Sequence, residues 1–87
     1  MMEAYGYIEV VGLVPAVAAA DAALKAANVA VVGKENTGAG MIAVIIKGEI
    51  GAVRAAVDAA EDAVEKIGKV VSTNVIARPD DSLIKLY

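Results

Sequence analysis

The hydrophobic pattern of the chain begins with a short strand followed by a helix. β-Branched and aromatic residues alternate from Tyr5 to Val10 and predict the strand, which Gly12 ends. Pro15 suits the first turn of a helix, where its missing N–H is not needed, and we expect this helix to run to about Ala27. Its apolar stripe recurs at helical spacing and comprises Leu13, Val17, Ala20, Leu24 and Ala27.

Two further strands follow around a glycine-rich turn. Val29 to Val32 predicts the second strand, which can continue to Glu35. The turn spans residues 36–40, and the apolar run from Met41 to Lys47 predicts a third strand. Because this run is continuous rather than alternating, we expect the third strand to be buried on both faces.

A second helix and a fourth strand complete the pattern. Glu49 suits the start of the helix, because a carboxylate is favourable at a helix N-terminus. The apolar face of this helix comprises Ile50, Val53, Val57, Ala60, Val64 and Ile67. Val70 to Ile76 predicts the last strand, which Pro79 ends, and residues 80–87 predict a short terminal helix.

The predicted order is therefore β-α-β-β-α-β within a single domain, residues 1–87. The motif Gly-x-(Val/Ile)-x-Ala-Val occurs at Gly12 and again at Gly48, so the two halves resemble each other. This pattern favours an α+β fold of the ferredoxin-like type, with a four-stranded antiparallel sheet, two helices on one face and the short C-terminal helix.

The composition indicates that the chain has more apolar residues than one small core can bury. Hydrophobic residues make up 59% of the 87 residues, while aromatic residues make up only 3%, with no Phe or Trp. Some of the apolar side chains should therefore lie in contacts between subunits. Oligomerisation would also supply stability that so small a domain lacks when it has no disulfide.

The charge and the absent residue types argue against several functions. The chain has no Cys and no His, so the commonest metal ligands and general bases are missing, and we expect no enzyme activity, no metal and no cofactor. A net charge of −3 without a basic stripe argues against nucleic-acid binding. The apolar runs are too short to cross a membrane, and without a secretory signal we expect the cytosol.

Two clusters of residues admit a chemical interpretation. Glu61, Asp62 and Glu65 could form a metal or acid–base site, but this spacing is more typical of a helix face in water. Gly38-Ala39-Gly40 could bind a phosphate, but a phosphate loop should open a helix, whereas this one joins two strands. The glycines therefore favour a hairpin turn with positive φ.

Four segments together resemble the hexamer-forming shell proteins of bacterial microcompartments, over nearly the whole chain. The segment from Asp21 to Val29 is similar to the family's Asp-x-x-x-Lys-(Ala/Ser)-Ala-Asn-Val stretch. Residues 37–40 stand at the family's Gly-Ser-Gly turn, residues 47–53 resemble its Gly-Asp-Val-x-Ala-Val run, and residues 75–79 resemble its Val-Ile-(Pro/Ala)-Arg-Pro.

The resemblance implies a flat cyclic hexamer that tiles edge to edge into sheets. Lys25, Asn28 and Arg78 would lie at the hexamer edge, where Lys25 meets its counterpart and Arg78 reaches across. The turn of Thr37, Gly38, Ala39 and Gly40 would line a central pore that passes small polar or anionic metabolites. Other shell proteins and encapsulated enzymes would be the partners.

The sequence departs from the family at two positions. Ala39 stands where Ser is common, so the pore would lack six hydroxyl groups, and Asp80 stands where His is frequent. A different class of function also remains open, namely a small-molecule-binding regulatory domain of the same topology. Its ligand would sit between subunits and could be held by backbone groups alone.

Overall fold

The computed structural model describes residues 2–78 of the chain. In this range the elements are β1 (Glu3–Val11), α1 (Leu13–Ala26), β2 (Val29–Gly38), β3 (Met41–Glu49), α2 (Ile50–Glu65) and β4 (Val70–Arg78). The predicted β-α-β-β-α-β order is confirmed, as is Pro15 in the first turn of its helix. The helix predicted for residues 80–87 lies outside the described residues.

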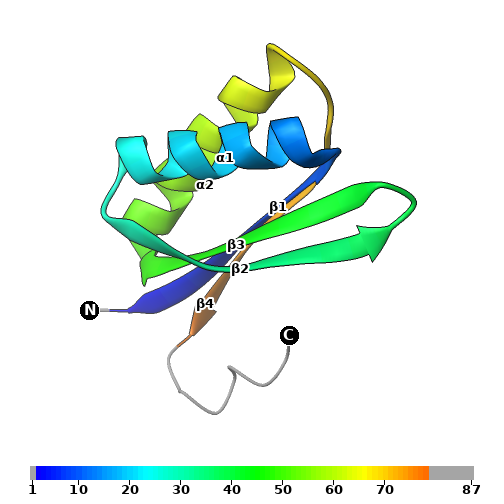
Figure 1. Ribbon diagram of the computed structural model, residues 1–87. Helices are drawn as coiled ribbons and strands as arrows, with labels where there is room; N and C mark the ends of the chain where they lie inside the picture. Colours follow the sequence, from blue (N-terminus) through cyan, green and yellow to red (C-terminus); the bar gives the residue numbers. More distant parts are fainter. Residues whose placement is uncertain (1, 79–87) are drawn as a thin grey trace.

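The four strands form one antiparallel sheet in the order β2-β3-β1-β4. Both helices cover the same face of this sheet (Figure 1), so the ferredoxin-like fold is confirmed. β2 reaches Gly38, beyond the predicted end at Glu35, because its polar second half pairs with β3 along a hairpin. An edge strand tolerates these polar residues because one of its sides faces water.

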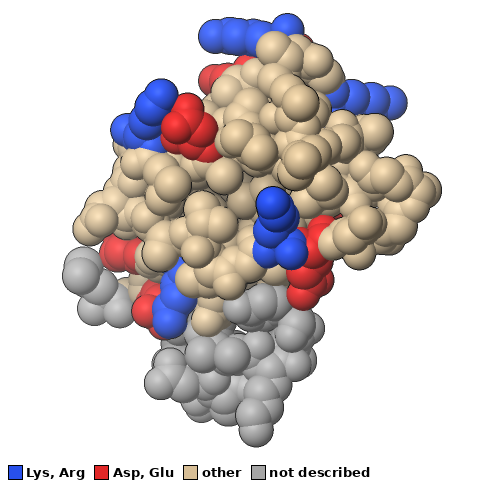
Figure 2. All heavy atoms as spheres, in the orientation of Figure 1, with Lys and Arg blue, Asp and Glu red and all other residues tan. Residues whose placement is uncertain are grey.

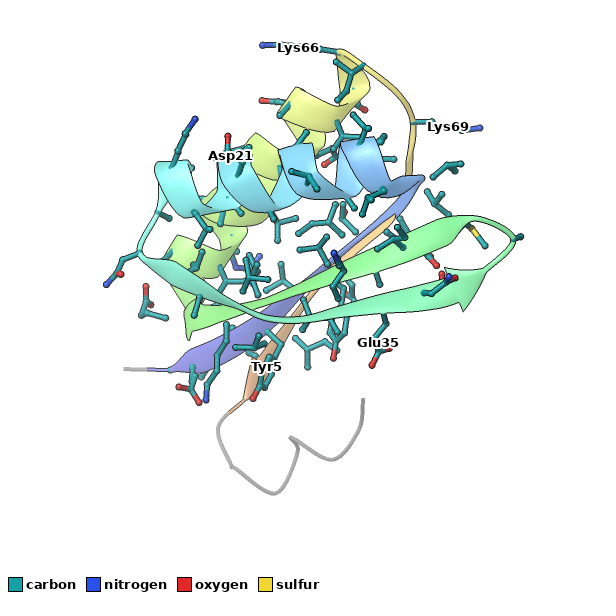
Figure 3. The ribbon with its side chains drawn as sticks, viewed as in Figure 1. Tyr5, Asp21, Glu35, Lys66 and Lys69 are labelled. Carbon is teal, nitrogen blue, oxygen red and sulfur yellow. The ribbon has the colours of Figure 1, made fainter. Side chains whose placement is uncertain are left out.

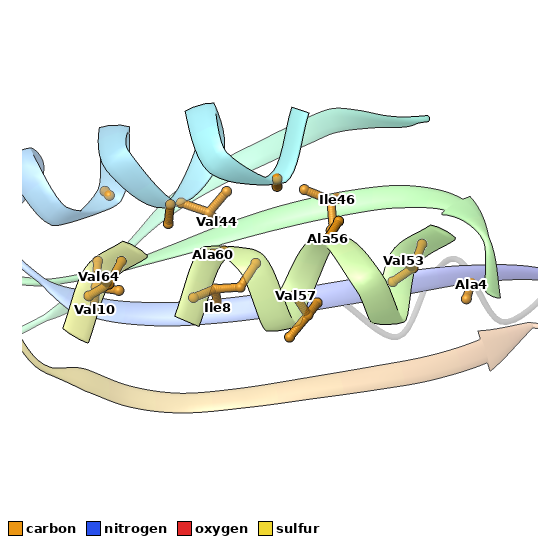
Figure 4. Packing of buried hydrophobic residues seen from close by; sticks show 13 residues of the cluster. Ala4, Ile8, Val10, Val44, Ile46, Val53, Ala56, Val57, Ala60 and Val64 are labelled. Atoms are coloured by element: carbon orange, nitrogen blue, oxygen red, sulfur yellow. The ribbon is translucent and has the colours of Figure 1, made fainter. Parts of the chain in front are cut away.

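The core lies between the sheet and the helices (Figure 4). Ile8 and Val10 from β1 pack with Val44 and Ile46 from β3 and are at most 1% exposed. Ala43 and Ile45 are 8% and 1% exposed although they face the other way, opposite the helices. The prediction that the third strand is buried on both faces is therefore confirmed.

The apolar stripe predicted for the first helix is only in part the face that α1 buries, since Ala20 and Ala27 pack against the core and are partly buried. Leu13, Val17 and Leu24 are more than half exposed, at 56%, 56% and 51%. The buried residues are Ala16, Ala19 and Ala23. A helix that presents methyl groups inward can lie close to its neighbours, whereas larger side chains would hold it away. The prediction was wrong for Leu13, Val17 and Leu24, whose larger side chains point outward.

The face predicted for the second helix is largely confirmed. Val53, Val57, Ala60 and Val64 are buried, but Ile67 is 56% exposed because α2 ends at Glu65, before that residue. The start of α2 is also as predicted. The Glu49 side chain accepts hydrogen bonds from the backbone N–H groups of Gly51 (3.0 Å) and Ala52 (3.3 Å), so it caps two otherwise unpaired donors.

Candidate functional site

The glycine-rich segment forms the tip of the β2–β3 hairpin, which extends away from the helices (Figure 1). Gly38 pairs with Met41, so the turn itself consists of Ala39 and Gly40, whose φ angles are +55° and +78°. Two consecutive positive φ angles in a two-residue loop are the mark of a type I′ turn, which matches the twist of the flanking strands. The hairpin interpretation is confirmed, and the segment does not open a helix as a phosphate loop would.

The tip of this hairpin has few side-chain contacts. Thr37 to Gly40 are all exposed, and a Cβ added to Gly38 or Gly40 would meet no other atom within 4 Å. Hydrogen bonds donated by backbone N–H groups hold the tip instead. The N–H of Gly12, which follows β1, donates to the Gly40 carbonyl (2.8 Å), and the Gly38 N–H donates to Asn36 Oδ1 (3.0 Å).

Thr37 lies at an irregularity in the strand pairing. Asn36 pairs with Ile42 and Gly38 with Met41, so Thr37 is an extra residue in β2. Such bulges can re-aim a side chain. The Thr37 hydroxyl donates a hydrogen bond of 2.6 Å to Glu9 Oε2 on β1, across the intervening strand β3. The sequence could not place this hydroxyl, and the structure assigns it to Glu9.

Glu9 is the residue of this region that sequence reasoning missed. Its second carboxylate oxygen, Oε1, accepts a hydrogen bond from the Ser72 hydroxyl on β4 (3.2 Å). Glu9 is opposite Ala43, as is Glu35, and Figure 3 shows that Glu35 extends from the face of the sheet opposite the helices. The only signal in the sequence is a carboxylate placed between the apolar residues Ile8 and Val10.

Lys25 and Asn28 lie at the other end of the sheet from the hairpin tip. Lys25 is in the last turn of α1, where it forms an i,i+4 ion pair with Asp21 (Nζ to Oδ2, 3.0 Å), and its side chain is 76% exposed. Asn28 is exposed and precedes β2, and its carbonyl oxygen lies close to Gly48. Both side chains are accessible from outside the subunit.

Strand register places Arg78 at this same end. Val29 pairs with Gly48, Gly48 with Ala4, and Ala4 with Ala77, whose neighbour in β4 is Arg78. The Arg78 side chain is outside the described part of the structure. Gly40 at the hairpin tip lies eight residues before Gly48, which is a distance of about 27 Å along the strand at ~3.4 Å per residue. The backbone thus places the three predicted edge positions at one end of the sheet and the turn at the other, with Asn28 next to β2 and Arg78 on β4, the two opposite edge strands.

The other candidate chemistry finds no support in residues 2–78. No group of three or more Asp, Glu, His or Cys side chains there is arranged to hold a metal ion. Glu65 and Asp62 are exposed on α2, as expected for a helix face in water. In the space-filling view, charged side chains are scattered over a mostly uncharged surface (Figure 2). None of the helices within residues 2–78 has both the length and the apolar character that a membrane span requires.

Comparison with known proteins gives a consistent result. The family model described as BMC domain matches residues 4–79. The bacterial microcompartment shell protein PduA of Citrobacter freundii is 45% identical over 84 residues, covering 97% of this chain and 90% of the relative. The carboxysome shell protein CsoS1 of Prochlorococcus marinus is 52% identical over 77 residues, covering 87% of this chain and 75% of the relative.

A solved structure is similar over most of the chain. It is a microcompartment protein from Desulfitobacterium hafniense, with a TM-score of 0.79 and 30% sequence identity over 87% of this chain. This chain covers 41% of that solved chain. The family match spans β1 to the end of β4 and includes the hairpin tip and the positions of Lys25, Asn28 and Arg78. The chain belongs to the BMC domain family.

Proposed function

We propose that this chain is a structural subunit of a microcompartment shell, forming cyclic hexamers that tile into sheets. Family membership and the names of the relatives, which are shell proteins, support this role. The proposed partners are further copies of the chain, other shell proteins and the enzymes inside the shell. The role is structural, and the subunit itself carries out no reaction.

The observation that carries the proposal is the separation of two sets of residues along the sheet. In a flat ring, one end of each subunit must face the axis and the other must face the rim. The exposed turn, residues 37–40, is at one end, and Lys25, Asn28 and Arg78 are at the other. We assign the turn to the ring opening and the other three residues to contacts between rings.

A second observation concerns the flanks of the subunit. A closed ring of more than two identical subunits needs two different surfaces that meet head to tail. Three exposed apolar side chains on the first turns of α1 offer one such surface: Leu13 (56%), Val14 (73%) and Val17 (56%). Monomeric proteins seldom expose large side chains of this kind side by side.

The chemistry of the proposed rim is suited to reversible contacts between flat edges. A Lys side chain can cover apolar surface with its stem while its ammonium group finds a carbonyl oxygen. An Arg side chain at position 78 would add forked hydrogen bonds with a fixed direction. At the ring axis, six copies of the turn would make a narrow opening for small polar metabolites, without hydroxyl groups at position 39.

Electron microscopy of the purified protein tests the proposal directly. We expect six-fold rings and extended sheets in negative stain, with the hairpin tips around the centre when images are averaged. A protein that stays monomeric at high concentration, or that assembles with another symmetry, would show that the proposed role is wrong. A thermal-shift screen against nucleotides and amino acids provides the contrast, because a regulatory domain would gain stability from its ligand.

A further inference from the structure

The carboxylate of Glu9 connects both edge strands of the sheet. Its Oε2 accepts from Thr37 on β2 at 2.6 Å, and its Oε1 accepts from Ser72 on β4 at 3.2 Å. In the sheet order β2-β3-β1-β4, this one side chain therefore ties together elements that do not pair with each other. The Thr37 contact is the shorter of the two, and it is charge-assisted because its acceptor is a carboxylate.

The sheet is built locally to allow this contact. β1 and β2 are separated by β3, so their backbones are about 9–10 Å apart at ~4.8 Å per strand. The residue of β3 beneath the contact is Ala43, opposite Glu9, and its single methyl group leaves room for the longer side chain to pass. The bulge at Thr37 shortens the remaining gap by turning its hydroxyl toward Glu9.

The hairpin tip beyond Thr37 depends on a small number of bonds. Gly38 and Gly40 have no side chains, and a Cβ added to either would meet no atom within 4 Å beyond its chain neighbours. Besides the pairing of β2 with β3, which reaches Gly38 and Met41, backbone N–H groups of Gly12 and Gly38 donate two further hydrogen bonds at the tip. Of these three hydrogen bonds, the Thr37–Glu9 bond is the one that joins the tip to the face of the sheet opposite the helices.

We infer that Glu9 is a positioning residue, which holds the hairpin tip through Thr37 and thereby sets the width of the ring opening. This inference rests on the proposed function for its second part, because only a ring has an opening. Its first part concerns the subunit alone. Six copies of the same bond would hold six tips at one radius, and losing the bond would let the tips spread or fold inward.

The variant Thr37→Val tests the inference with little change of shape. Valine keeps the β-branched form and strand preference of threonine but has no hydroxyl. Hydrogen exchange measured on the assembled protein should show amides 36–41 exchanging about three- to tenfold faster, the range expected for loss of one exposed charge-assisted hydrogen bond. Thr37→Ser, which keeps the hydroxyl, should exchange like the parent.

Thr73→Val is the matched control, because Thr73 is an exposed threonine in β4 that pairs with Ile8 and so points to the other face of the sheet from Glu9. We expect its exchange at residues 36–41 to equal that of the parent. Equal exchange in Thr37→Val and Thr73→Val would overturn the inference. Glu9→Gln gives an independent variant, and it should also loosen the tip because an uncharged acceptor is weaker.

The second readout is the opening itself, measured in a structure of the ring as the distance between Ala39 Cα atoms on opposite subunits. We expect this distance to change in Thr37→Val and to stay as in the parent in Thr73→Val. A faster-exchanging tip with an unchanged opening would refute the assignment of width to Glu9. If the parent forms no ring, the proposed function fails, while the exchange measurement still decides whether Glu9 positions the tip.

Discussion

Gly6 of β1 lies directly against Val57 of α2. A Cβ added to Gly6 would be 2.8 Å from Val57 Cγ2, and it would also crowd Val53 Cγ1 at 2.9 Å and Ile46 Cγ1 at 3.0 Å. All three neighbours are buried, so none can move into water. The absence of a side chain at Gly6 therefore allows α2 to pack this close to the sheet.

Gly6→Ala should lower the free energy of unfolding by about 1–3 kcal/mol, the usual range for overpacking a core. Chemical denaturation at a fixed protein concentration would measure the change. Gly33→Ala is the matched control on β2, because its new Cβ would meet mainly the flexible end of Ile45, at 3.2 Å. If both variants lose the same stability, close packing at Gly6 is not the cause.

Ala39 has a φ of +55°, a conformation that disfavours residues with a Cβ by about 1–2 kcal/mol. Ala39→Asn places Asn-Gly in the type I′ turn, the preferred pair for this geometry. We expect Ala39→Asn to raise the free energy of unfolding by about 0.5–1 kcal/mol. Ala39→Val should lower the free energy of unfolding, because a β-branched residue fits this conformation poorly. Calorimetry would measure both variants, and a valine variant more stable than the asparagine variant would contradict the prediction.

Lys25→Ala should leave the rings intact and abolish the extended sheets, because Lys25 is assigned to contacts between rings. The ion pair with Asp21 does not explain such an effect, since both side chains are more than 60% exposed and a pair of this kind adds little stability. Asp21→Asn, which removes only the ion pair, is therefore the control. Electron microscopy at equal protein concentrations would detect the difference.

The same experiment extends to the two other edge positions. Arg78→Ala and Asn28→Ala are expected to weaken the sheets, whereas Lys66→Ala, a change of an exposed lysine after α2, should not. Sheets of normal extent in Lys25→Ala and Arg78→Ala would show that the assigned edge is wrong, even if the rings themselves are six-fold.

Glu49→Ala should destabilise the start of α2, because it removes the acceptor for the N–H groups of Gly51 and Ala52. We expect a loss of about 1 kcal/mol in the free energy of unfolding, typical of a lost N-cap. Glu49→Gln keeps an acceptor oxygen and should lose less. Equal losses in the two variants would mean that the charge, and not the hydrogen bonds, stabilises the helix end.

Much of the fold could be predicted because local signals agree with one another. Gly12 ends β1 before α1, and the continuous apolar run of β3 reports burial on both faces, although β3 continues through Gly48 to Glu49. The buried face of α1 could not be predicted in the same way. Periodicity gives more weight to Leu13 and Leu24 than to the alanines, but tight packing against neighbouring elements selects the smaller side chains.

The candidate site divides along a similar line. Residues 37–40 could be recognised as a turn from their glycines alone, since positive φ is a local requirement. The Thr37–Glu9 bond could not be found, because it joins residues 28 positions apart. Its existence depends on the strand register, on a bulge in β2 and on the small residue between the two strands, and none of these is encoded in a local pattern.

Because α1 buries alanines, its larger side chains add little to the stability of the isolated subunit. Its bulky aliphatic groups are turned toward the surroundings, so trimming Leu13 or Val14 would remove little from the isolated subunit. At low protein concentration, such variants would have nearly the same melting temperature as the parent. They would differ from it only at concentrations high enough for the subunits to assemble. A screen that measures the melting temperature of the isolated subunit would therefore score them as neutral. Measuring the melting temperature over a range of protein concentrations would reveal the loss of assembly.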